Sequence, residues 1–321
     1  MMYLGIDIAK ATFEAALQRA NGKWKTTRGP NTPTGHAQLV AWLQHHATAP
    51  VHACLEATGT YGEALATALV AAGSTVSVVN PAAVHAFAAS QLRRAKTDRV
   101  DAQILAQFAA AHRPPAWTPP PAELRELQEL VRRIDALEQM LVQERNRFAS
   151  GGTSATVRAS IAATIAHFEA AIDALLTQIQ THFDQHPPLR AQRDLLTSIP
   201  GIGEKTAARV LAASRDPAQF ASARQYAAFS GLVPRPVESG TLRGKPRIAR
   251  LGSARLRRTL YFPALTALRH NPVLRAFQQR LALKHKPKMV IVAAAMRKLL
   301  HLIYGVLKSK RPFDPAIAMH A

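Results

Sequence analysis

The sequence predicts an α/β domain at the N-terminal end, a helical middle segment and a mainly α-helical C-terminal region. Three observations support this prediction. Apolar runs of strand length alternate with helical patterns over residues 1–115, a proline-rich stretch follows, and apolar residues at heptad spacing begin directly after it. A chain of 321 residues, 48% of them hydrophobic, is long enough for two or three domains with cores of their own.

The N-terminal region contains a regular succession of predicted elements. A hairpin is expected around Asn21-Gly22, since this dipeptide favours a two-residue turn between strands. Further strands are expected at residues 3–9, 51–57 and 75–80, and helices at residues 34–46, 61–72 and 100–111. Three strands with hairpin character, followed by helix, strand, helix, strand and helix, is the order expected of a ribonuclease H-like fold, a mixed sheet with helices on its faces.

The stretch from Arg113 to Pro121 is predicted to be a stiff linker between domains. It separates a first domain at residues 1–115 from a middle segment at 116–188 and a third domain at 189–321. Two apolar heptad series mark the middle segment: Leu127, Leu130, Ile134, Leu137 and Leu141, then Ile161, Ile165, Phe168, Ile172, Leu175 and Ile179. The helix-breaking residues 150–153 lie between them, so we expect either a helical hairpin or a coiled coil with a partner chain.

Positive charge is concentrated towards the C-terminal end. The chain has 41 Lys and Arg against 20 Asp and Glu, a net charge of +21, and residues 186–321 alone contribute +20 of it. Such a concentrated excess is typical of a protein that binds a polyanion, and nucleic acid is the expected partner. No membrane partner is expected, because the basic residues do not lie along one amphipathic helix. Cys54 is the only cysteine, which excludes a disulfide framework within the chain and favours a cytoplasmic location.

Four acidic residues are placed where they could hold a metal ion. Asp7 lies inside an apolar strand and Glu56 ends another, while Asp98 and Asp101 are three residues apart and share one face of a helix. Clustered carboxylates repel one another unless a cation neutralises them, and Mg²⁺ prefers such oxygen ligands. Two such ions ~4 Å apart can hold the attacking and leaving oxygens of a phosphodiester. Taken singly, the two helical aspartates fit a solvated helix face about as well, and Glu56 fits a loop cap.

The basic region contains a second set of candidate residues. Residues 198–212 resemble a helix-hairpin-helix, in which Gly201 and Gly203 turn the backbone and hold a phosphate at a helix N-terminus; the alternative is a turn in a packed core. The cations expected to bind nucleic acid are Lys205, Arg243, Lys245, Arg247, Arg250, Arg255, Arg257 and Arg258. Ser239 lies beside Gly240 in what the sequence predicts to be a basic loop, and serves either as a turn residue or as a nucleophile on phosphorus.

Six motifs, in their order along the chain, resemble one family. GIDIAK, LEATGTY, AKTDRVDA, IPGIGEKTA, GLVPR and ESG look like those of the DEDD transposases of bacterial insertion sequences, the insertion sequence 110 family of bridge-RNA-guided recombinases. The resemblance covers nearly the whole chain. It implies a RuvC-like N-terminal domain, a coiled-coil segment that mediates oligomerisation, and a C-terminal transposase domain.

The resemblance also implies roles for individual residues. The family's metal-binding tetrad falls on Asp7, Glu56, Asp98 and Asp101, and its nucleophilic serine falls on Ser239. Two other hydroxyls lie nearby in the sequence, Thr241 and Ser253, and both rank below Ser239 as the nucleophile. The family's Lys-Arg-Gly run is replaced by Arg250-Leu251-Gly252, which keeps one charge. The implied cofactor is Mg²⁺ or Mn²⁺. The implied partners are donor and target DNA, a structured guide RNA, and further copies of the chain, since the family forms dimers that pair into tetramers.

Three other functions fit part of the sequence. A nuclease like a Holliday-junction resolvase would use the same acids with water as the nucleophile, and would form no covalent link to DNA. A sugar kinase or ATPase of the actin-like type also has an aspartate in its first strand, but such an enzyme leaves the basic region unexplained, and neither GxxxxGK[ST] nor GxGxxG occurs. A DNA-bridging protein without activity would not cut DNA when a metal is supplied.

Overall fold

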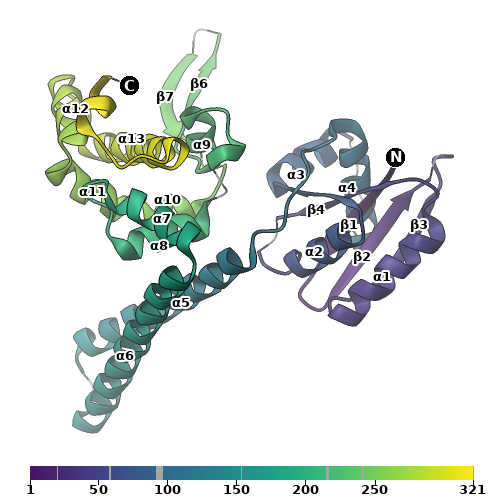
Figure 1. Cartoon of the computed structure of the whole chain (residues 1–321), viewed down its shortest axis with the longest axis horizontal. Coiled ribbons are helices and arrows are strands. Elements are labelled where there is room, and N and C mark those ends of the chain that lie inside the picture. The colour runs from purple at the N-terminus through teal and green to yellow at the C-terminus, as the bar shows by residue number, and fades with distance from the viewer. Residues whose placement is uncertain are drawn as a thin grey trace. The chain divides into compact units, whose positions relative to one another are not determined.

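The chain forms two compact units, Met1–Pro120 and Pro121–Ala321 (Figure 1). The computed structural model describes residues 1–19, 21–57, 59–91, 97–152, 154–214, 217–240, 242–249 and 251–320. The boundary between the units lies at the end of the proline-rich stretch. The helices of the expected middle segment belong to the second unit, and the division of the chain into three domains stays a prediction.

A five-stranded mixed sheet forms the centre of the first unit. Its strands are β1 (Met2–Ile8), β2 (Thr12–Gln18), β3 (Trp24–Pro30), β4 (Val51–Glu56) and β5 (Thr75–Val79). Their order across the sheet is β3-β2-β1-β4-β5. The first three strands are antiparallel neighbours, while β4 pairs with both β1 and β5 in parallel. The predicted mixed α/β sheet is confirmed, including the hairpin at Asn21-Gly22.

Four helices cover the two faces of this sheet. They are α1 (Pro33–His46), α2 (Glu63–Ala71), α3 (Pro81–Ser90) and α4 (Asp98–His112). Apolar side chains of α1 and α2 pack on one face, and those of α3 and α4 pack on the other. The sequence did not predict α3 as a separate helix, although its start is marked: Pro81 occupies the first turn, and the Asn80 side chain accepts a hydrogen bond from Ala82 N.

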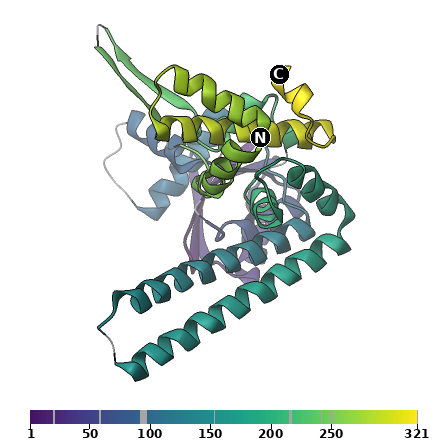
Figure 2. The same cartoon turned by 90° about the vertical axis from the view of Figure 1, so that its left-hand side faces the viewer.

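Two long antiparallel helices begin the second unit, α5 (Ala122–Ser150) and α6 (Ala155–Gln185) (Figure 2). Their apolar residues pack against one another along one seam. The heptad residues predicted in α5 are buried there, except that Leu130 is only partly buried and its neighbour Val131 is buried instead. The His182 ring at the end of α6 lies 2.8 Å from the Glu123 carbonyl oxygen at the start of α5. The predicted helical hairpin therefore forms within one chain, and a coiled coil with a partner chain stays a prediction.

The rest of the second unit is mostly helical, as the sequence predicts. Its helices are α7 (Pro187–Thr197), α8 (Glu204–Ala213), the short 3₁₀ helix η1 (Pro217–Gln219), α9 (Ala223–Phe229), α10 (Ala254–Thr259), α11 (Tyr261–His270), α12 (Pro272–Leu283), α13 (Lys288–Ser309) and α14 (Pro315–His320). One hairpin, β6 (Pro234–Ser239) and β7 (Leu242–Ile248), projects from these helices in both views (Figures 1 and 2).

Two helices of the described chain, α6 and α13, are long and apolar enough to cross a membrane by length and composition alone. One or two such helices are a weak indication, because a core helix of a soluble protein passes the same test. Half of the most apolar part of α13 is buried among the other helices of its unit. In α6 only 6% of the most apolar part is buried, and its heptad residues pack on α5.

Candidate active site and nucleic-acid interface

Asp7 and Glu56 occupy matching positions at the carboxyl ends of two neighbouring parallel strands. Ile6 of β1 is in register with Leu55 of β4, and Asp7 and Glu56 are the next residues of the two strands. Side chains alternate along a strand, so Asp7 shares a face with Gly5, and Glu56 shares that face with Cys54. Both carboxylates are half-buried and lie on the side of the sheet that α3 and α4 cover.

The helix that carries Asp98 and Asp101 crosses this same face at Gly5. A Cβ atom at Gly5 would lie 1.8 Å from the carbonyl oxygen of Ala102 and 2.4 Å from the backbone nitrogen of Ala106. No side chain fits there, and the lack of one lets α4 approach the strand that contains Asp7. Because Asp101 is the neighbour of Ala102, the contact brings the first turns of α4 onto this strand.

The first turn of α4 is capped and carries both aspartates. The Thr97 hydroxyl accepts a hydrogen bond from Val100 N at 3.3 Å. Asp98 is exposed and Asp101 is half-buried. Two carboxylates at a helix N-terminus are stabilised by the positive end of the helix dipole, which offsets part of their mutual repulsion. The preceding residues of the AKTDRVDA motif, Ala95 and Lys96, lie outside the described residues.

The thiol of Cys54 shows that this face is closed to solvent beside Glu56. Burial and, to a lesser degree, the negative charge of Glu56 raise the pKa of Cys54 to about 12. The thiol is therefore neutral at ordinary pH and is a poor ligand or nucleophile. The polar chemistry on this face is carried by carboxylates.

The four acids have the right chemistry for a hard divalent cation, since each offers carboxylate oxygens. Within the part of the chain that the structure describes, no three His, Cys, Asp or Glu side chains form a group that could hold a metal ion. The geometry thus brings Asp7 and Glu56 to one edge of the sheet and α4 onto its face. It does not assemble a complete ligand set, and the metal site stays a prediction.

Ser239 ends a strand, which corrects the expectation of a basic loop. Residues of β6 and β7 alternate in an antiparallel ladder in which Ser239 is opposite Leu242, and Gly240 follows at φ +55°. The sequence suggests a loop because prolines interrupt both strands and a glycine also interrupts β7. The Ser239 side chain is exposed beside the turn.

The base of this hairpin is anchored by Arg257. Its Nη1 atom donates a 2.8 Å hydrogen bond to the carbonyl oxygen of the buried Ser230. Gly231 follows at φ +73°, where a Cβ atom would meet Arg257 Nη1 at 2.6 Å. Arg257 was expected to bind nucleic acid, but the structure uses one edge of its guanidinium to hold the chain where the hairpin begins.

The predicted helix-hairpin-helix corresponds to α7, a turn and α8. Gly201 has φ +104°, and a Cβ atom there would lie 2.7 Å from Ala267 Cβ of α11, so this glycine is packed against another helix. The buried Asn271 side chain reaches the Pro200 carbonyl oxygen at 3.5 Å. Gly203 is different, because it is exposed, has open space around it and begins α8 without a side-chain cap. Of the two glycines, Gly203 is therefore the one at which a helix N-terminus is exposed to solvent.

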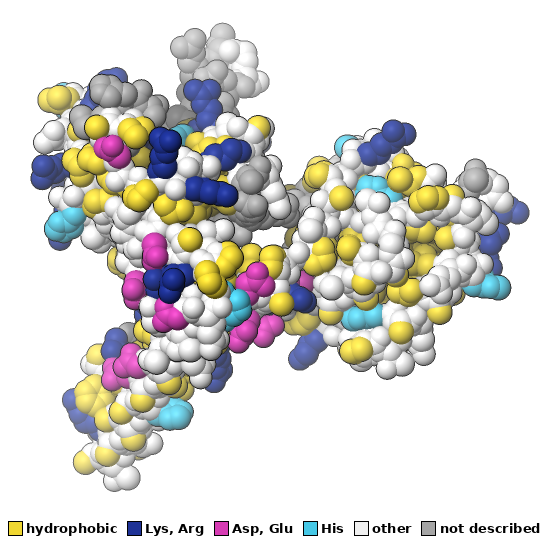
Figure 3. Space-filling model, in the orientation of Figure 1, with side chains coloured by type: hydrophobic (Ala, Val, Ile, Leu, Met, Phe, Trp, Pro, Cys, Tyr) yellow, Lys and Arg dark blue, Asp and Glu magenta, His cyan; other side chains and the backbone are white. Residues whose placement is uncertain are grey.

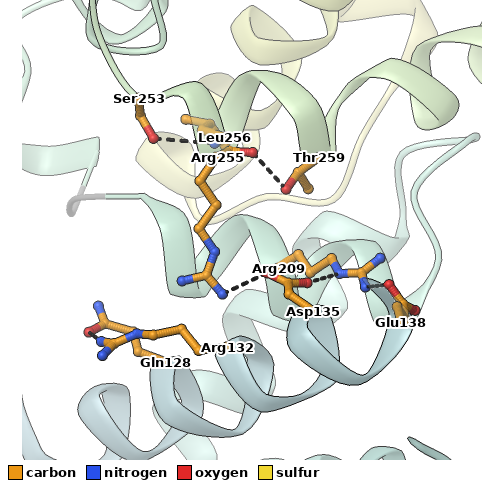
Figure 4. Close-up of polar contacts among 9 residues, drawn as sticks. All are labelled: Gln128, Arg132, Asp135, Glu138, Arg209, Ser253, Arg255, Leu256 and Thr259. Carbon is orange, nitrogen blue, oxygen red and sulfur yellow. Dashed lines mark hydrogen bonds and ion pairs between the residues drawn. The ribbon is translucent and has the colours of Figure 1, made fainter. Parts of the chain in front are cut away.

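Two cations expected to bind nucleic acid are paired with acids of α5 instead. Lys205 forms an ion pair with Glu138, and Arg255 Nη2 lies 3.0 Å from Asp135 Oδ2. Arg209, which the sequence did not single out, bridges the same two acids (Figure 4). Figure 3 shows Lys and Arg side chains bordered by Asp and Glu side chains over this part of the unit. The cluster ties α8 and α10 to α5.

Burial and charge oppose each other at Glu138. Burial alone would raise the pKa of its carboxyl group. Hydrogen bonds and positive charge from Lys205 and Arg209 outweigh burial and hold this pKa below its usual value. Glu138 is therefore ionised at neutral pH.

The remaining predicted cations divide into two groups. Arg258 is exposed on α10. Arg243, Lys245 and Arg247 occupy alternate positions of β7, and their side chains lie outside what the structure describes, as do the whole residues Thr241 and Arg250. A binding role for these cations stays a prediction.

Comparisons with known proteins decide the family. Residues 4–150 match a model of DEDD transposases of the IS110 type, described as "Transposase", and residues 193–279 match the "Transposase IS116/IS110/IS902 family". The chain is 36% identical over 319 residues to the pilin gene-inverting protein of Moraxella bovis, covering 98% of both chains. It is also 36% identical over 319 residues to the protein of that name from Moraxella lacunata. The chain belongs to the IS110 family of transposases.

The transposase is therefore an enzyme of DNA transposition and recombination, and DEDD-type domains of this kind generally depend on a divalent metal. A more distant relative, the insertion element IS110 uncharacterized 43.6 kDa protein of Streptomyces coelicolor, is 27% identical over 59% of this chain and 45% of its own length.

The sequence also failed to single out an exposed aromatic residue of this transposase. Phe262, in α11, leaves 73% of its surface exposed directly after the cationic run. The signal that could have found it is the Tyr261-Phe262 pair following Arg257 and Arg258, because arginine beside aromatic residues is typical of nucleic-acid surfaces.

Proposed function

We propose that this transposase cuts and rejoins DNA through a covalent phosphoserine link at Ser239, assisted by a divalent metal held by Asp7, Glu56, Asp98 and Asp101, and that a structured RNA selects the DNA sites. The observation that supports it best is the register of β1 and β4. It sets Asp7 and Glu56 side by side at the edge of a sheet whose face is crossed by the helix that carries the two other acids.

Ser239 supplies the nucleophile in this proposal. Its Oγ atom attacks a DNA phosphorus, the bond from phosphorus to one sugar oxygen breaks, and that oxygen leaves with a proton as a free hydroxyl. The energy of the broken phosphodiester is kept in the serine ester, so a second DNA end can take its place without another energy source. The exposed position of Ser239 beside a tight turn suits a strand that must enter and leave.

The four acids provide the charge for the metal. A bound Mg²⁺ or Mn²⁺ stabilises the negative charge that develops on the phosphate during attack. Asp7 and Glu56 are held by the backbone of the sheet, so their carboxylates are preorganised. Asp98 and Asp101 follow the helix, and the glycine contact at β1 keeps that helix in place.

Two features support site selection by RNA, which are the excess of basic residues in the second unit and the predicted helix-hairpin-helix. A phosphate at the exposed start of α8 contacts backbone donors only, and such a contact positions DNA without reading bases. A recombinase that must choose its sites needs another source of sequence information, and base pairing to an RNA supplies it. By likeness to the pilin gene-inverting proteins, inversion of a DNA segment is one expected outcome of the exchange.

A trapped adduct tests the serine. The wild-type protein, incubated with Mg²⁺, its RNA and end-labelled DNA of its own element, is expected to form a labelled protein band on denaturing electrophoresis. Ser239→Ala should form none. Ser253→Ala is the matched control, because that hydroxyl caps α10 by accepting a hydrogen bond from Leu256 N and should leave the adduct intact. An adduct that persists in Ser239→Ala, or DNA hydrolysed with no adduct in the wild type, contradicts the proposal, and the second result favours a resolvase-like nuclease.

An isosteric change tests the acids. Asp7→Asn is expected to abolish recombination while the protein stays folded, because the amide keeps the shape and loses the charge that binds the metal. Glu14→Gln is the control, since Glu14 is the cross-strand partner of Asp7 on β2 and lies outside the tetrad. Equal activity of Asp7→Asn and the wild type would exclude the metal site.

Removal of RNA tests the guide. Protein purified after nuclease treatment should not recombine a donor and target pair until the element's RNA is restored. Changes in the pairing loops of that RNA should redirect recombination to DNA with the complementary change. Full activity without RNA would mean that the protein reads DNA itself.

A further inference from the structure

A shallow apolar depression lies on the second unit where α10, α11 and α13 meet. It is lined by Arg257, Arg258, Tyr261, Phe262 and Met296 and has a volume of about 430 Å³. Although two arginines contribute, the lining is almost wholly apolar, so they present their aliphatic stems to it. The proposed chemistry at Ser239 and the acids makes no use of this depression.

Phe262 is held in place with most of its ring uncovered. Its ring makes an edge contact with Tyr261, with centroids 5.2 Å apart and planes at 79°. Tyr261 is half-buried against the core and Met296 is buried, so both are fixed by packing. Phe262 itself is 73% exposed, and an uncovered aromatic ring on a rigid base is a surface on which another flat ring can stack.

The charge around the depression favours a polyanion. No Asp or Glu occurs between Ser239 and Phe313, a stretch that contains α10 to α13. Arg258, directly beside the depression, is exposed. A second copy of the same face would bring positive charge against positive charge, whereas a nucleic-acid strand would bring phosphates.

The depression adjoins the base of the hairpin that carries Ser239. Arg257 forms part of its wall and at the same time donates to the Ser230 carbonyl oxygen, where the chain turns towards β6. A base bound in the depression would therefore lie beside the anchor of the strand that presents the proposed nucleophile.

We propose that the depression binds an unpaired base of the DNA strand undergoing exchange, stacked on Phe262, with a neighbouring phosphate at Arg258; the inference rests on the proposed strand-exchange function. Bases inside a duplex are stacked on one another and cannot reach a protein ring, but cutting and exchanging strands leaves bases unpaired. Stacking on an aromatic ring tolerates any base, which suits an enzyme whose sequence choice is made elsewhere.

The experiment compares three DNA ligands on the full-length protein by fluorescence anisotropy. They are an oligothymidylate of about 12 nucleotides, an abasic oligomer of the same length and charge, and a duplex of that length. Phe262→Ala is expected to weaken binding of the oligothymidylate by about 5- to 100-fold, and to leave the abasic oligomer and the duplex within about twofold. Phe262→Trp should restore binding of the oligothymidylate. Leu283→Ala, which removes another apolar side chain that is 81% exposed, is the matched control and should change none of the three.

Each other outcome overturns the proposal in a recognisable way. Equal losses on the thymidylate and abasic oligomers would mean that no base is stacked. A loss seen with an oligouridylate and not with the oligothymidylate would assign the depression to RNA. If Phe262→Ala binds DNA like the wild type, and sedimentation shows that the wild type self-associates whereas Phe262→Ala does not, the depression binds a second copy of the chain. The result is independent of the serine test, since Ser239→Ala should bind the oligothymidylate like the wild type whether or not an adduct forms.

Discussion

A single methyl group at Gly5 should separate the helix of the two aspartates from the strand of Asp7. In Gly5→Ala the new Cβ atom would lie 1.8 Å from Ala102 O, 2.4 Å from Ala106 N and 2.9 Å from Leu105 Cβ. Two of these three atoms belong to the backbone of α4. No rotation of a side chain can relieve the clash, so the helix itself must move.

The size of the movement sets the expected loss. Real Cβ atoms essentially never approach another heavy atom within 3.0 Å, so the 1.8 Å contact demands a shift of about 1.2 Å. A radial gap of 0.5–1 Å forfeits roughly a quarter to a half of the dispersion energy between packed atoms. Overpacking typically costs about 1–3 kcal/mol, and the rigid neighbours here place Gly5→Ala at about 3 kcal/mol or more of unfolding free energy. In molecules that still fold, a misplacement of about 1 Å at the acids should lower recombination by about 100-fold.

Tryptophan fluorescence can measure this in the intact protein. The three tryptophans, Trp24, Trp42 and Trp117, all lie in the first unit, so their emission during urea titration reports the unfolding of that unit alone. Far-UV circular dichroism of the same samples follows the helices of both units, most of which belong to the second. Gly5→Ala should lower the fluorescence midpoint and leave the helical transition of the second unit in place.

A second glycine of the same unit is the control. At Gly62 a Cβ atom would meet Ile8 at 3.8 Å, an ordinary contact, and φ is −87°. Gly62→Ala should therefore stay within about 0.5 kcal/mol of the wild type. If Gly5→Ala unfolds at the wild-type urea concentration and keeps wild-type recombination, then α4 does not depend on this close approach, and the argument that links it to the acids is wrong.

Three further predictions concern ionisable groups. Because burial raises the pKa of Cys54 to about 12, the native thiol should resist iodoacetamide at about pH 8 and react quickly in urea, as followed by mass spectrometry. Burial also raises the pKa of Tyr226 to about 12, above the value near 10 in the unfolded chain. The stability that the neutral phenol contributes is therefore complete below about pH 10 and is lost as the pH rises towards 12. Thermal melts across this pH range should show the decline, and Tyr226→Phe should reduce it. Although burial opposes them, Lys205 and Arg209 lower the pKa of Glu138. The contribution of Glu138 to stability is therefore complete above its ordinary pKa and is lost as the pH falls through the lowered pKa. Glu138→Gln should reduce the fall in melting temperature of the second unit at acid pH, and an unchanged fall would show that the cluster stabilises nothing.

The sheet was predictable because its signals are local. Strand-length apolar runs, the Asn-Gly turn and helical spacing are each contained in a few residues, and all five strands of the first unit were found. The second hairpin was missed because glycine and proline break its pattern, and pairing between β6 and β7 supplies the order that propensity does not. The α3 helix was missed because a strand ending in Asn-Pro was taken as a stop, although that same Asn80 caps a new helix.

The four acids are identifiable from the sequence as candidates, but the close approach of α4 to the strand of Asp7 is not. Asp7 inside an apolar strand is unusual by itself. The role of Gly5 as the crossing point of α4 depends on atoms about a hundred residues further along the chain, at Ala102 and Ala106. Only the register between strands shows that Glu56 lies beside Asp7 on one side, with Glu14 of β2 opposite it on the other.

The charge count shows most clearly what sequence alone leaves out. A sum over residues treats every cation of the C-terminal region as available to phosphate, yet Asp135 on α5 meets Arg255, which follows it 120 residues later. Arg209 forms ion pairs with both Asp135 and Glu138, and Lys205 forms one with Glu138. These three cations, Lys205, Arg209 and Arg255, therefore already have carboxylate partners. Any DNA contact at these side chains must compete with an internal ion pair, while Arg258 meets no such competition within the described residues. Arg258, beside the exposed ring of Phe262, is therefore one of the cations that can meet phosphate without giving up a carboxylate partner.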